Sequence, residues 1–347
     1  MVPHASSSAS QRILVIGPAW IGDMIMTQPL FMRIKQRSPD ARIDVLSPEW
    51  TLPLLARMPE VSEAIASGAR HRELGLRGRF ALARTLRARG YDQAIVLPRS
   101  FKSALIPYFA GIPRRTGYRG EWRYGLINDV RQLTTPWRAT PTAQRNAALA
   151  HEHAEAPTPL PQPHLEIDKA NRTRAAQQHA LATHGPIAVL APGAEYGPAK
   201  QWPAERFAEL ARNLIAAGWQ VWLMGSAKEH PLAEQIRSLA SPTVVNLCGV
   251  TTLLDAIDLM SLAHVVITND SGLMHMAVAL NRPLIAIYGS TSPTITPLPP
   301  GIAQVLYSQR PCSPCSQRTC PLGHYGCLHD IRVEDVIQRL PKLNTAR

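Results

Sequence analysis

The stretch AHVVITNDSGLMHMAVALNRPLIAIYG, residues 263–289, decides the fold class. Residues 265–268 form a β-branched run of the kind that lies buried on both faces of a parallel sheet. The polar turn NDSG follows at residues 269–272, and apolar residues then recur at helical spacing until NRP ends the helix before a second strand. A helix that starts at a strand's carboxyl end offers unpaired N–H groups to an anion. The alternative is that Asp270 or Ser271 only caps the helix.

The rest of the chain repeats this alternation of strands and helices. Further strands are predicted over residues 12–17, 43–46, 91–97, 187–191, 220–224, 244–247 and 284–288. Helices are predicted over residues 24–34, 52–58, 80–88, 100–109, 204–217, 230–239 and 253–262. The stretch APTPLPQP, residues 156–163, cannot continue helix or sheet. The sequence therefore predicts an α/β protein with two Rossmann-like domains that face each other across a cleft.

The length of 347 residues also fits two domains. We expect a disordered extension, an N-terminal domain, a Pro-rich linker, a C-terminal domain and a final helix with tail, over residues 1–11, 12–155, 156–170, 171–330 and 331–347. The polar, Ser-rich start lacks the apolar segment of a secretory signal. No stretch reaches the ~20 apolar residues that span a bilayer. We therefore expect a cytoplasmic protein.

The formal net charge is +12, and the excess is concentrated between Arg57 and Arg145. A basic surface exposed to solvent is one interpretation. The other is a polyanionic partner of the N-terminal half, such as nucleic acid, anionic lipid or a phosphorylated glycan. Charge alone does not choose between them.

The first strand runs into a turn that has the spacing of a phosphate loop but not its chemistry. Asp23 follows Gly22 where that loop needs lysine, and Met24 stands where it needs Ser or Thr. A carboxylate there repels phosphate and suits a general base that activates a hydroxyl. The alternative is that Asp23 caps a helix that begins at Met24, and both roles are compatible.

The second half offers groups for an anionic ligand. Gly193 and Gly197 let the backbone approach a ligand, and Lys200 is a mobile charge suited to phosphate, or else an ordinary surface lysine. Glu229 follows a strand at a position that commonly accepts from ribose hydroxyls. The chain contains no Asp-x-Asp sequence, so a metal bridging a nucleotide sugar is not indicated. Lys200 and the helix that begins near Ser271 would have to neutralise a leaving diphosphate.

Four of the five cysteines are clustered in the sequence, at Cys312, Cys315, Cys320 and Cys327. Their spacing allows a zinc or iron–sulfur site, and an oxidation-sensitive pair or plain packing are the alternatives. Permanent disulfides are not expected in the cytosol. Cys248 is predicted to be an ordinary buried thiol.

Five stretches together make the chain resemble the ADP-heptose:lipopolysaccharide heptosyltransferases. They are ILVIGPAWIGDM (13–24), LPRSFKSALIP (97–107), FAGIPRRTGYRGE (109–121), PGAEYGPAKQWP (192–203) and TNDSGLMH (268–275). The similarity spans residues 12–340. The resemblance implies a GT-B architecture, in which the N-terminal domain binds the lipid-linked acceptor and the C-terminal domain binds ADP-heptose. It also implies an inverting reaction without a covalent intermediate.

Carried over residue by residue, the resemblance implies that Asp23 is the base and that Lys200 neutralises phosphate. It places ribose at Glu229 and adenine at the backbone around Thr251. The donor-binding residues that it implies are Gly193, Glu195, Lys200, Glu229, Thr251, Asp270, Ser271, Gly272, Leu273 and His275. We add the basic residues expected to face a phosphorylated acceptor, Arg99, Lys102, Arg114, Arg115, Arg119 and Arg123. No metal ligand or cofactor is expected at the active site.

The expected reaction moves heptose from ADP-L-glycero-D-manno-heptose to the first heptose of the lipopolysaccharide inner core. The expected partners are ADP-heptose, the lipid A–Kdo–heptose acceptor and the anionic cytoplasmic face of the inner membrane, where the protein would be peripheral. Alternatives are transfer to Kdo itself, or a nucleotide-sugar epimerase on the same fold. A nucleic-acid-binding protein is not expected, because the C₂H₂ spacing and an aromatic RNA-binding motif are missing.

Overall fold

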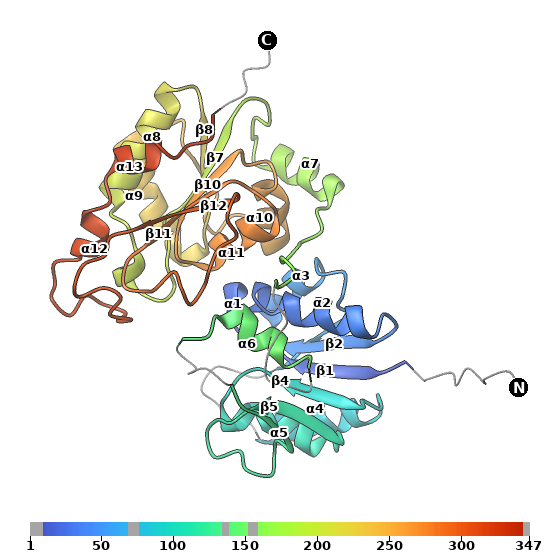
Figure 1. Cartoon of the computed structure of the whole chain (residues 1–347). Coiled ribbons are helices and arrows are strands. Elements are labelled where there is room, and N and C mark those ends of the chain that lie inside the picture. The colour runs from blue at the N-terminus through green and yellow to red at the C-terminus, as the bar shows by residue number, and fades with distance from the viewer. Residues whose placement is uncertain (1–9, 69–75, 134–138, 152–158, 343–347) are drawn as a thin grey trace, which may run out of the picture. The chain divides into compact units, whose positions relative to one another are not determined.

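The structure is a computed structural model that describes residues 10–68, 76–133, 139–151 and 159–342. The chain forms two compact units, Met1–Gln162 and Pro163–Arg347 (Figure 1). Residues 1–9 of the predicted extension and 156–158 of the predicted linker lie outside the described residues. The domain limits given above therefore remain predictions.

The N-terminal unit is built on a parallel sheet with the strand order β3-β2-β1-β4-β5-β6. Its strands are β1 (Arg12–Ile16), β2 (Arg42–Ser47), β3 (Glu63–Ala66), β4 (Gln93–Val96), β5 (Arg114–Tyr118) and β6 (Asp129–Arg131). Its helices are α1 (Ile21–Ile25), α2 (Gln28–Arg37), η1 (Glu49–Thr51), α3 (Leu52–Leu55), α4 (Leu76–Arg87), α5 (Phe101–Phe109) and α6 (Thr142–Ala148). Helices on both faces explain why the central strands are continuous aliphatic runs.

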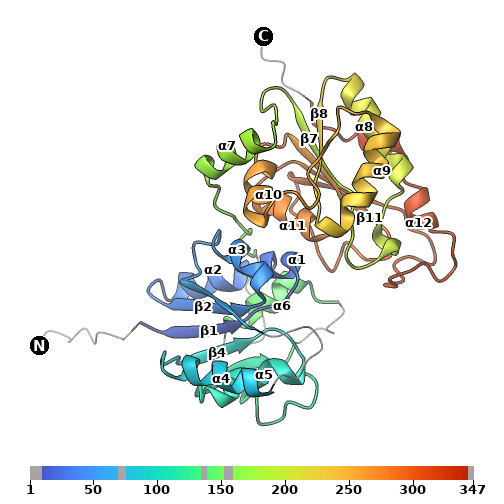
Figure 2. The same ribbon diagram turned by 180° about the vertical axis from the view of Figure 1, so that it is seen from behind.

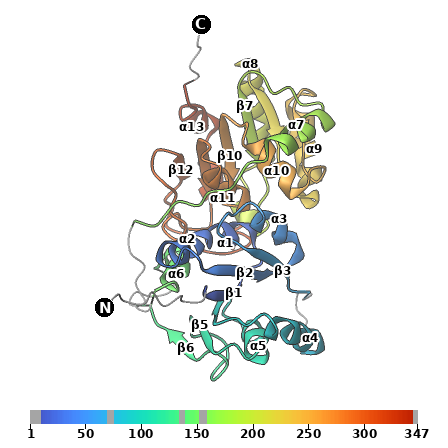
Figure 3. The same ribbon diagram turned by 90° about the vertical axis from the view of Figure 1, so that its right-hand side faces the viewer.

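The core of this unit has two layers, one on each face of the sheet. Leu14 and Ile16 of β1 lie in one buried cluster with Leu86 of α4 and Ile106 of α5. Helices α2 and α6 pack against each other on the opposite face (Figure 3). This alternation follows from the two-residue period of a strand.

The C-terminal unit repeats the plan, with the order β12-β11-β10-β7-β8-β9 in a second parallel sheet. Its strands are β7 (Ile187–Ala191), β8 (Gln220–Leu223), β9 (Val245–Asn246), β10 (Val265–Asn269), β11 (Leu284–Tyr288) and β12 (Ala303–Tyr307). Its helices are α7 (Lys169–Gln178), η2 (Pro198–Lys200), α8 (Ala204–Ala216), η3 (Ala227–Glu229), α9 (His230–Ala240), α10 (Leu253–Met260), α11 (Gly272–Ala279), α12 (Gly326–His329) and α13 (Val333–Ile337).

Counted from its own first strand, each sheet has the order 3-2-1-4-5-6, which is the Rossmann order. The direction of strand addition reverses between β1 and β4 in one unit and between β7 and β10 in the other. In open α/β sheets, ligands bind outside the carboxyl ends of the strands at this switch point. The two switch points are therefore the places to search for a site.

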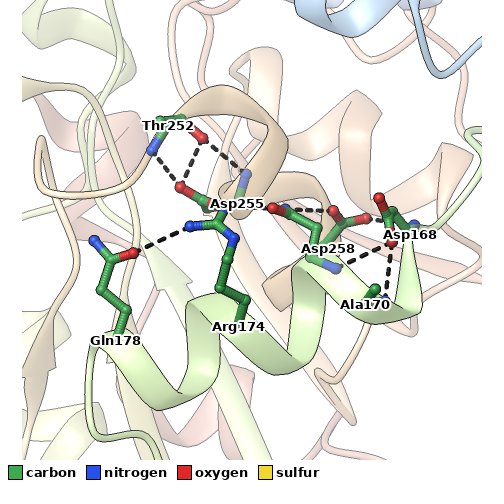
Figure 4. A network of polar contacts seen from close by, with 8 residues as sticks. Asp168, Ala170, Arg174, Gln178, Thr252, Asp255 and Asp258 are labelled. Carbon is green, nitrogen blue, oxygen red and sulfur yellow. Dashed lines mark hydrogen bonds and ion pairs between the residues drawn. The ribbon is translucent and has the colours of Figure 1, made fainter.

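A polar network fixes the start of the C-terminal unit, where α7 lies beside α10 (Figures 2 and 4). Asp168 caps α7 and accepts a hydrogen bond from the N–H of Asn171. Asp258 of α10 accepts from the Asp168 N–H at 2.9 Å and from Nδ2 of Asn171 at 2.8 Å. Arg174 pairs with Asp255 at 3.1 Å. These bonds hold α7 against the edge of its own unit.

The predicted elements are confirmed in type, and several strands and helices were not predicted. The helix expected after the first strand is two helices, α1 and α2. Helix α1 starts at Ile21 after Trp20, so Asp23 lies within the helix and the expected cap at this residue is wrong. Sequence reasoning missed β3, β5, β6 and β12 and the helices α6, α7 and α12, whereas α13 is the predicted final helix. Among the described residues, no helix is long and apolar enough to cross a membrane.

Candidate active site

Asn269, the last residue of β10, organises the switch point of the C-terminal unit. Its side chain is fully buried. Its Nδ2 donates to the Pro192 carbonyl at 2.6 Å, and its Oδ1 accepts from the Trp202 N–H at 3.1 Å. Asn269 therefore joins both ends of the loop that follows β7, residues 192–203. Sequence reasoning quoted Asn269 as part of a polar turn but missed this role.

Lys200 and Asp270 form an ion pair at the centre of this switch point. Nζ of Lys200 lies 2.5 Å from Oδ2 of Asp270, and the two side chains are only 12% and 7% exposed. Thr291 donates to the same carboxylate oxygen at 2.6 Å. Nζ also lies 4.9 Å from the centre of the Tyr196 ring. The structure thus brings together two predicted site residues that are distant in the sequence, and it holds the lysine in one place.

The start of α11 is open at this point. Ser271 occupies the N-cap position, but its side chain makes no capping hydrogen bond, and its Oγ lies 3.1 Å from Oγ1 of Thr268. The Asp270 carboxylate is bonded to Lys200 and Thr291, so the expectation that Asp270 or Ser271 caps the helix with its side chain is wrong. The N–H groups of the first turn of α11 have no carbonyl partner within the helix, and an anion is the acceptor that a helix N-terminus favours.

His275 of α11 lies within electrostatic reach of the ion pair and is only 8% exposed. Burial lowers the pKa of His275 to about 4, and the charge of Lys200 acts in the same direction while that of Asp270 opposes it. The imidazole is therefore neutral at physiological pH. Neutral His275 therefore adds no charge beside the Lys200–Asp270 pair.

Glu229 occupies the space that Gly193 leaves. A Cβ atom at position 193 would lie 1.5 Å from Oε1 of Glu229, and one at Gly225 would lie 2.6 Å from Oε2. The carboxylate also accepts from the Ser226 N–H at 2.6 Å. Gly193 was predicted to allow close approach of a ligand, and in the structure it allows close approach of Glu229. The two predicted site residues therefore lie against each other at the carboxyl edge of the sheet.

The remaining predicted donor residues lie along the same edge. Glu195 pairs with Lys228 at 2.7 Å on the exposed surface. Thr251, after β9, donates from Oγ1 to the Leu247 carbonyl at 3.2 Å. Leu273 lies in the first turn of α11 and is half-buried. All of these positions belong to turns after β7, β8, β9 or β10, as the Rossmann topology requires.

In the N-terminal unit, Asp23 is half-buried and lies in α1, the helix that follows the loop after β1. Its charge acts on Arg145 of α6, whose pKa is lowered by burial and raised in part by Asp23. Arg145 is itself held by the Thr140 carbonyl at 2.6 Å and by Oγ1 of Thr142 at 2.9 Å. Sequence reasoning missed Arg145, because nothing in the spacing of the chain connects it with Asp23.

The predicted acceptor arginines fall into two groups. Arg115 donates to the Leu126 and Ile112 carbonyls at 2.7 and 2.6 Å, and Arg123 is buried and donates to the Pro98 carbonyl at 2.7 Å. Burial lowers the pKa of Arg123 to about 10. These two guanidinium groups hold loop segments in place through hydrogen bonds to backbone carbonyls.

The second group of acceptor residues is more open to solvent. Arg99 and Arg119 are exposed, with Nε of Arg99 donating to the Arg119 carbonyl at 3.0 Å. Arg114 is also exposed and pairs with Asp129 at 2.9 Å. Lys102 is half-buried in α5. Contact between any of these residues and an acceptor stays a prediction.

Two units with the Rossmann strand order are the architecture of glycosyltransferases of GT-B type. The chain belongs to glycosyltransferase family 9 (heptosyltransferase), whose profile matches residues 79–326.

Individual relatives agree with this assignment. The chain is 43% identical over 343 residues to lipopolysaccharide heptosyltransferase 2 of Escherichia coli K12, covering 96% of this chain and 98% of the relative. It is 46% identical over 298 residues to lipooligosaccharide heptosyltransferase 2 of Haemophilus influenzae, covering 82% and 85%.

A solved structure matches equally well. The structure of E. coli ADP-heptose lipopolysaccharide heptosyltransferase II superposes with a TM-score of 0.85 at 43% identity, over 95% of this chain and 97% of that one. The predicted resemblance, the GT-B class and the enzyme class are confirmed. So is the predicted place in lipopolysaccharide inner-core synthesis.

Proposed function

We propose that the C-terminal unit binds ADP-heptose and that the N-terminal unit presents the hydroxyl of a lipid A–Kdo–heptose acceptor to it. The observation that carries this proposal is the Lys200–Asp270 pair beside the uncapped start of α11. A fixed cation beside the first-turn N–H groups of a helix is suited to a diphosphate. The names of the relatives agree with a donor of this kind.

On the donor side, the diphosphate would lie against the N–H groups after Ser271, with Lys200 beside it. When the bond between C1 of heptose and the phosphate oxygen breaks, the electron pair leaves with ADP. Lys200 would stabilise the charge that develops there. Glu229 would accept from the ribose hydroxyls, and the backbone at Thr251 would border adenine.

On the acceptor side, Asp23 would take the proton of the attacking hydroxyl. The acceptor oxygen forms its bond to C1 from the face opposite the leaving ADP, so the configuration inverts and no covalent enzyme intermediate arises. Arg99, Lys102 and Arg119 would contact phosphates of the inner core. We place this reaction at the cytoplasmic face of the inner membrane, where the lipid-linked acceptor and the basic N-terminal unit would meet.

The deciding experiment is mass spectrometry of reactions that combine ADP-heptose with acceptors carrying no heptose or one heptose. We expect a gain of one heptose only on the acceptor that already carries one. Transfer to the heptose-free acceptor would instead favour action on Kdo. Conversion of the nucleotide sugar without any acceptor, followed by NMR, would favour an epimerase.

A further inference from the structure

The cysteine cluster has no part in the proposed transfer, yet the fold gathers it. Cys312, Cys315, Cys320 and Cys327 line one pocket, together with residues that include Ala199 and Ser290. All four are free thiols of intermediate exposure. Cys327 interacts electrostatically with each of the other three. Residues that lie up to fifteen positions apart thus share one small space, which is formed by the loop after β12 and by the start of α12.

An arginine that is paired with a carboxylate lies near two of these cysteines. Arg310 interacts electrostatically with Cys312 and Cys327, and Asp330 holds its guanidinium at 2.5 and 2.6 Å. A Cβ atom at Gly326 would lie 2.5 Å from Cζ of Arg310, so glycine is what lets the guanidinium come this close. Four cysteines that line one pocket beside an arginine need more explanation than packing in an exposed loop.

We propose that Cys312, Cys315, Cys320 and Cys327 together bind one thiophilic metal ion, Zn²⁺ or iron. Four thiolates are the tetrahedral ligand set that these ions prefer, and a site with four protein ligands leaves no open position for catalysis. Each thiol gives up its proton to solvent as its bond to the metal forms. A divalent ion with four thiolates carries a net charge of −2.

Binding would require the side chains to turn toward the centre of the pocket. No group of three or more His, Cys, Asp or Glu side chains in the described part of the chain is already arranged to hold a metal ion. A cysteine sulfur moves by rotation about a single bond, and the intermediate exposure of all four leaves room for that rotation.

Binding of the metal would fix the cysteine loop, which contacts the loop that contains Lys200. This step rests on the proposed function. The cysteine loop contacts the Lys200 loop directly, since the Ala199 N–H donates to the Arg318 carbonyl at 3.0 Å and Tyr196 donates to the Ser316 carbonyl at 2.6 Å. The guanidinium of Arg318 lies 5.3 Å from the centre of the Tyr196 ring, whose other neighbour is Lys200. A loop fixed by metal would fix the position of Lys200.

The test is elemental analysis of the full chain, purified without a metal-affinity step. We expect about one equivalent of zinc or iron per chain, and an absorption spectrum separates the two because only iron–thiolate bonds absorb in the visible range. Cys320→Ser should lose the metal, whereas Cys248→Ser, which changes the one cysteine outside the pocket, should retain it. Protein free of both metals, or with two disulfides among the four cysteines by mass spectrometry, would overturn the proposal.

A second measurement covers the case in which Cys320→Ser does not fold. Titration of the unchanged protein with a mercurial should release the metal in proportion to the thiols modified, and Co²⁺ supplied to the metal-free protein should give the visible bands of tetrahedral cobalt–thiolate. Calorimetry with ADP then separates the two proposals. A metal-loaded protein that does not bind ADP contradicts the donor site, and a metal-free protein that binds ADP contradicts the metal site.

Discussion

The two units have the same strand order, but they place different groups in the turns at the switch point. After β1, the N-terminal unit places Asp23 in a five-residue helix, and after β4 it places Arg99. After β7, the C-terminal unit places Lys200 in a short turn, and after β10 it opens the N-terminus of α11. The fold therefore fixes where a ligand binds, while a few turn residues decide which ligand.

The contrast is sharpest in the first helical turn. In α1, the first turn contains the acid Asp23, which repels a phosphate. In α11, the first turn contains no acidic residue, and the aspartate just before it is neutralised by Lys200. One unit is thus suited to deprotonate a neutral hydroxyl, and the other is suited to hold an anion.

The largest expected effect comes from removing the acid of the N-terminal unit. Asp23→Ala should lower kcat by about 10²–10⁴-fold, the range typical for a general base, while ADP binding changes by only a few-fold. Steady-state kinetics and calorimetry with ADP measure the two quantities. Asp40→Ala, which removes an exposed aspartate of the same unit, is the matched control. Full activity of the Asp23 variant would reject the base assignment and remove the contrast between the units.

The next prediction tests how far the switch point of the C-terminal unit excludes water. The folded pKa of His275, about 4, lies below its unfolded value, so the unfolded chain binds more protons between these two values. The stability associated with the neutral imidazole is fully present above about pH 6.5 and is lost as pH falls toward 4. The loss should be on the order of 3 kcal/mol.

Chemical unfolding at several pH values measures this loss. His275→Gln should flatten the fall in unfolding free energy between pH 6.5 and pH 4. His184→Gln, at an exposed histidine of the same unit, should leave the slope unchanged. An equal slope in all three proteins would mean that His275 titrates normally and that water reaches the ion pair.

The central strands of both sheets can be predicted from the sequence, because each is an aliphatic run buried on both faces. Strands β3, β6 and β12 are short or half-buried and lack this signal. Strand β5 begins with Arg114 and Arg115, whose charges hide a strand that is buried at its other end. Sequence patterns report burial, so strands with little buried side-chain surface escape them.

The candidate site shows a similar limit. The polar turns after β1, β7 and β10 can be located from the sequence, because topology brings the carboxyl ends of neighbouring strands to one edge. The partners of individual side chains cannot be predicted in this way. That Lys200 pairs with Asp270, and that Arg145 lies within electrostatic reach of Asp23, depends on packing between segments far apart in the chain.

A smaller effect should follow from removing the cation of the C-terminal unit. Lys200→Ala should weaken ADP binding by about 10–100-fold, in line with about 1.5–3 kcal/mol for a hydrogen bond to a charged group, and turnover should fall with it. Asp270 would also lose its counter-charge, so Lys200→Ala combined with Asp270→Asn should recover stability without recovering ADP affinity. Lys169→Ala, at an exposed lysine of α7, is the control. Unchanged kinetics in Lys200→Ala would exclude this lysine from the donor site.

The smallest effect tests whether Gly193 serves Glu229, as the structure indicates, or a ligand directly. Gly193→Ala must displace the Glu229 carboxylate, because a Cβ atom there would lie 1.5 Å from Oε1. We expect ADP affinity to fall by about tenfold or less, the range of one hydrogen bond. If the glycine acts through Glu229, Gly193→Ala should have little further effect in a Glu229→Ala protein, since the clashing atoms are gone. Additive losses in the double variant would show that the glycine makes room for the nucleotide itself.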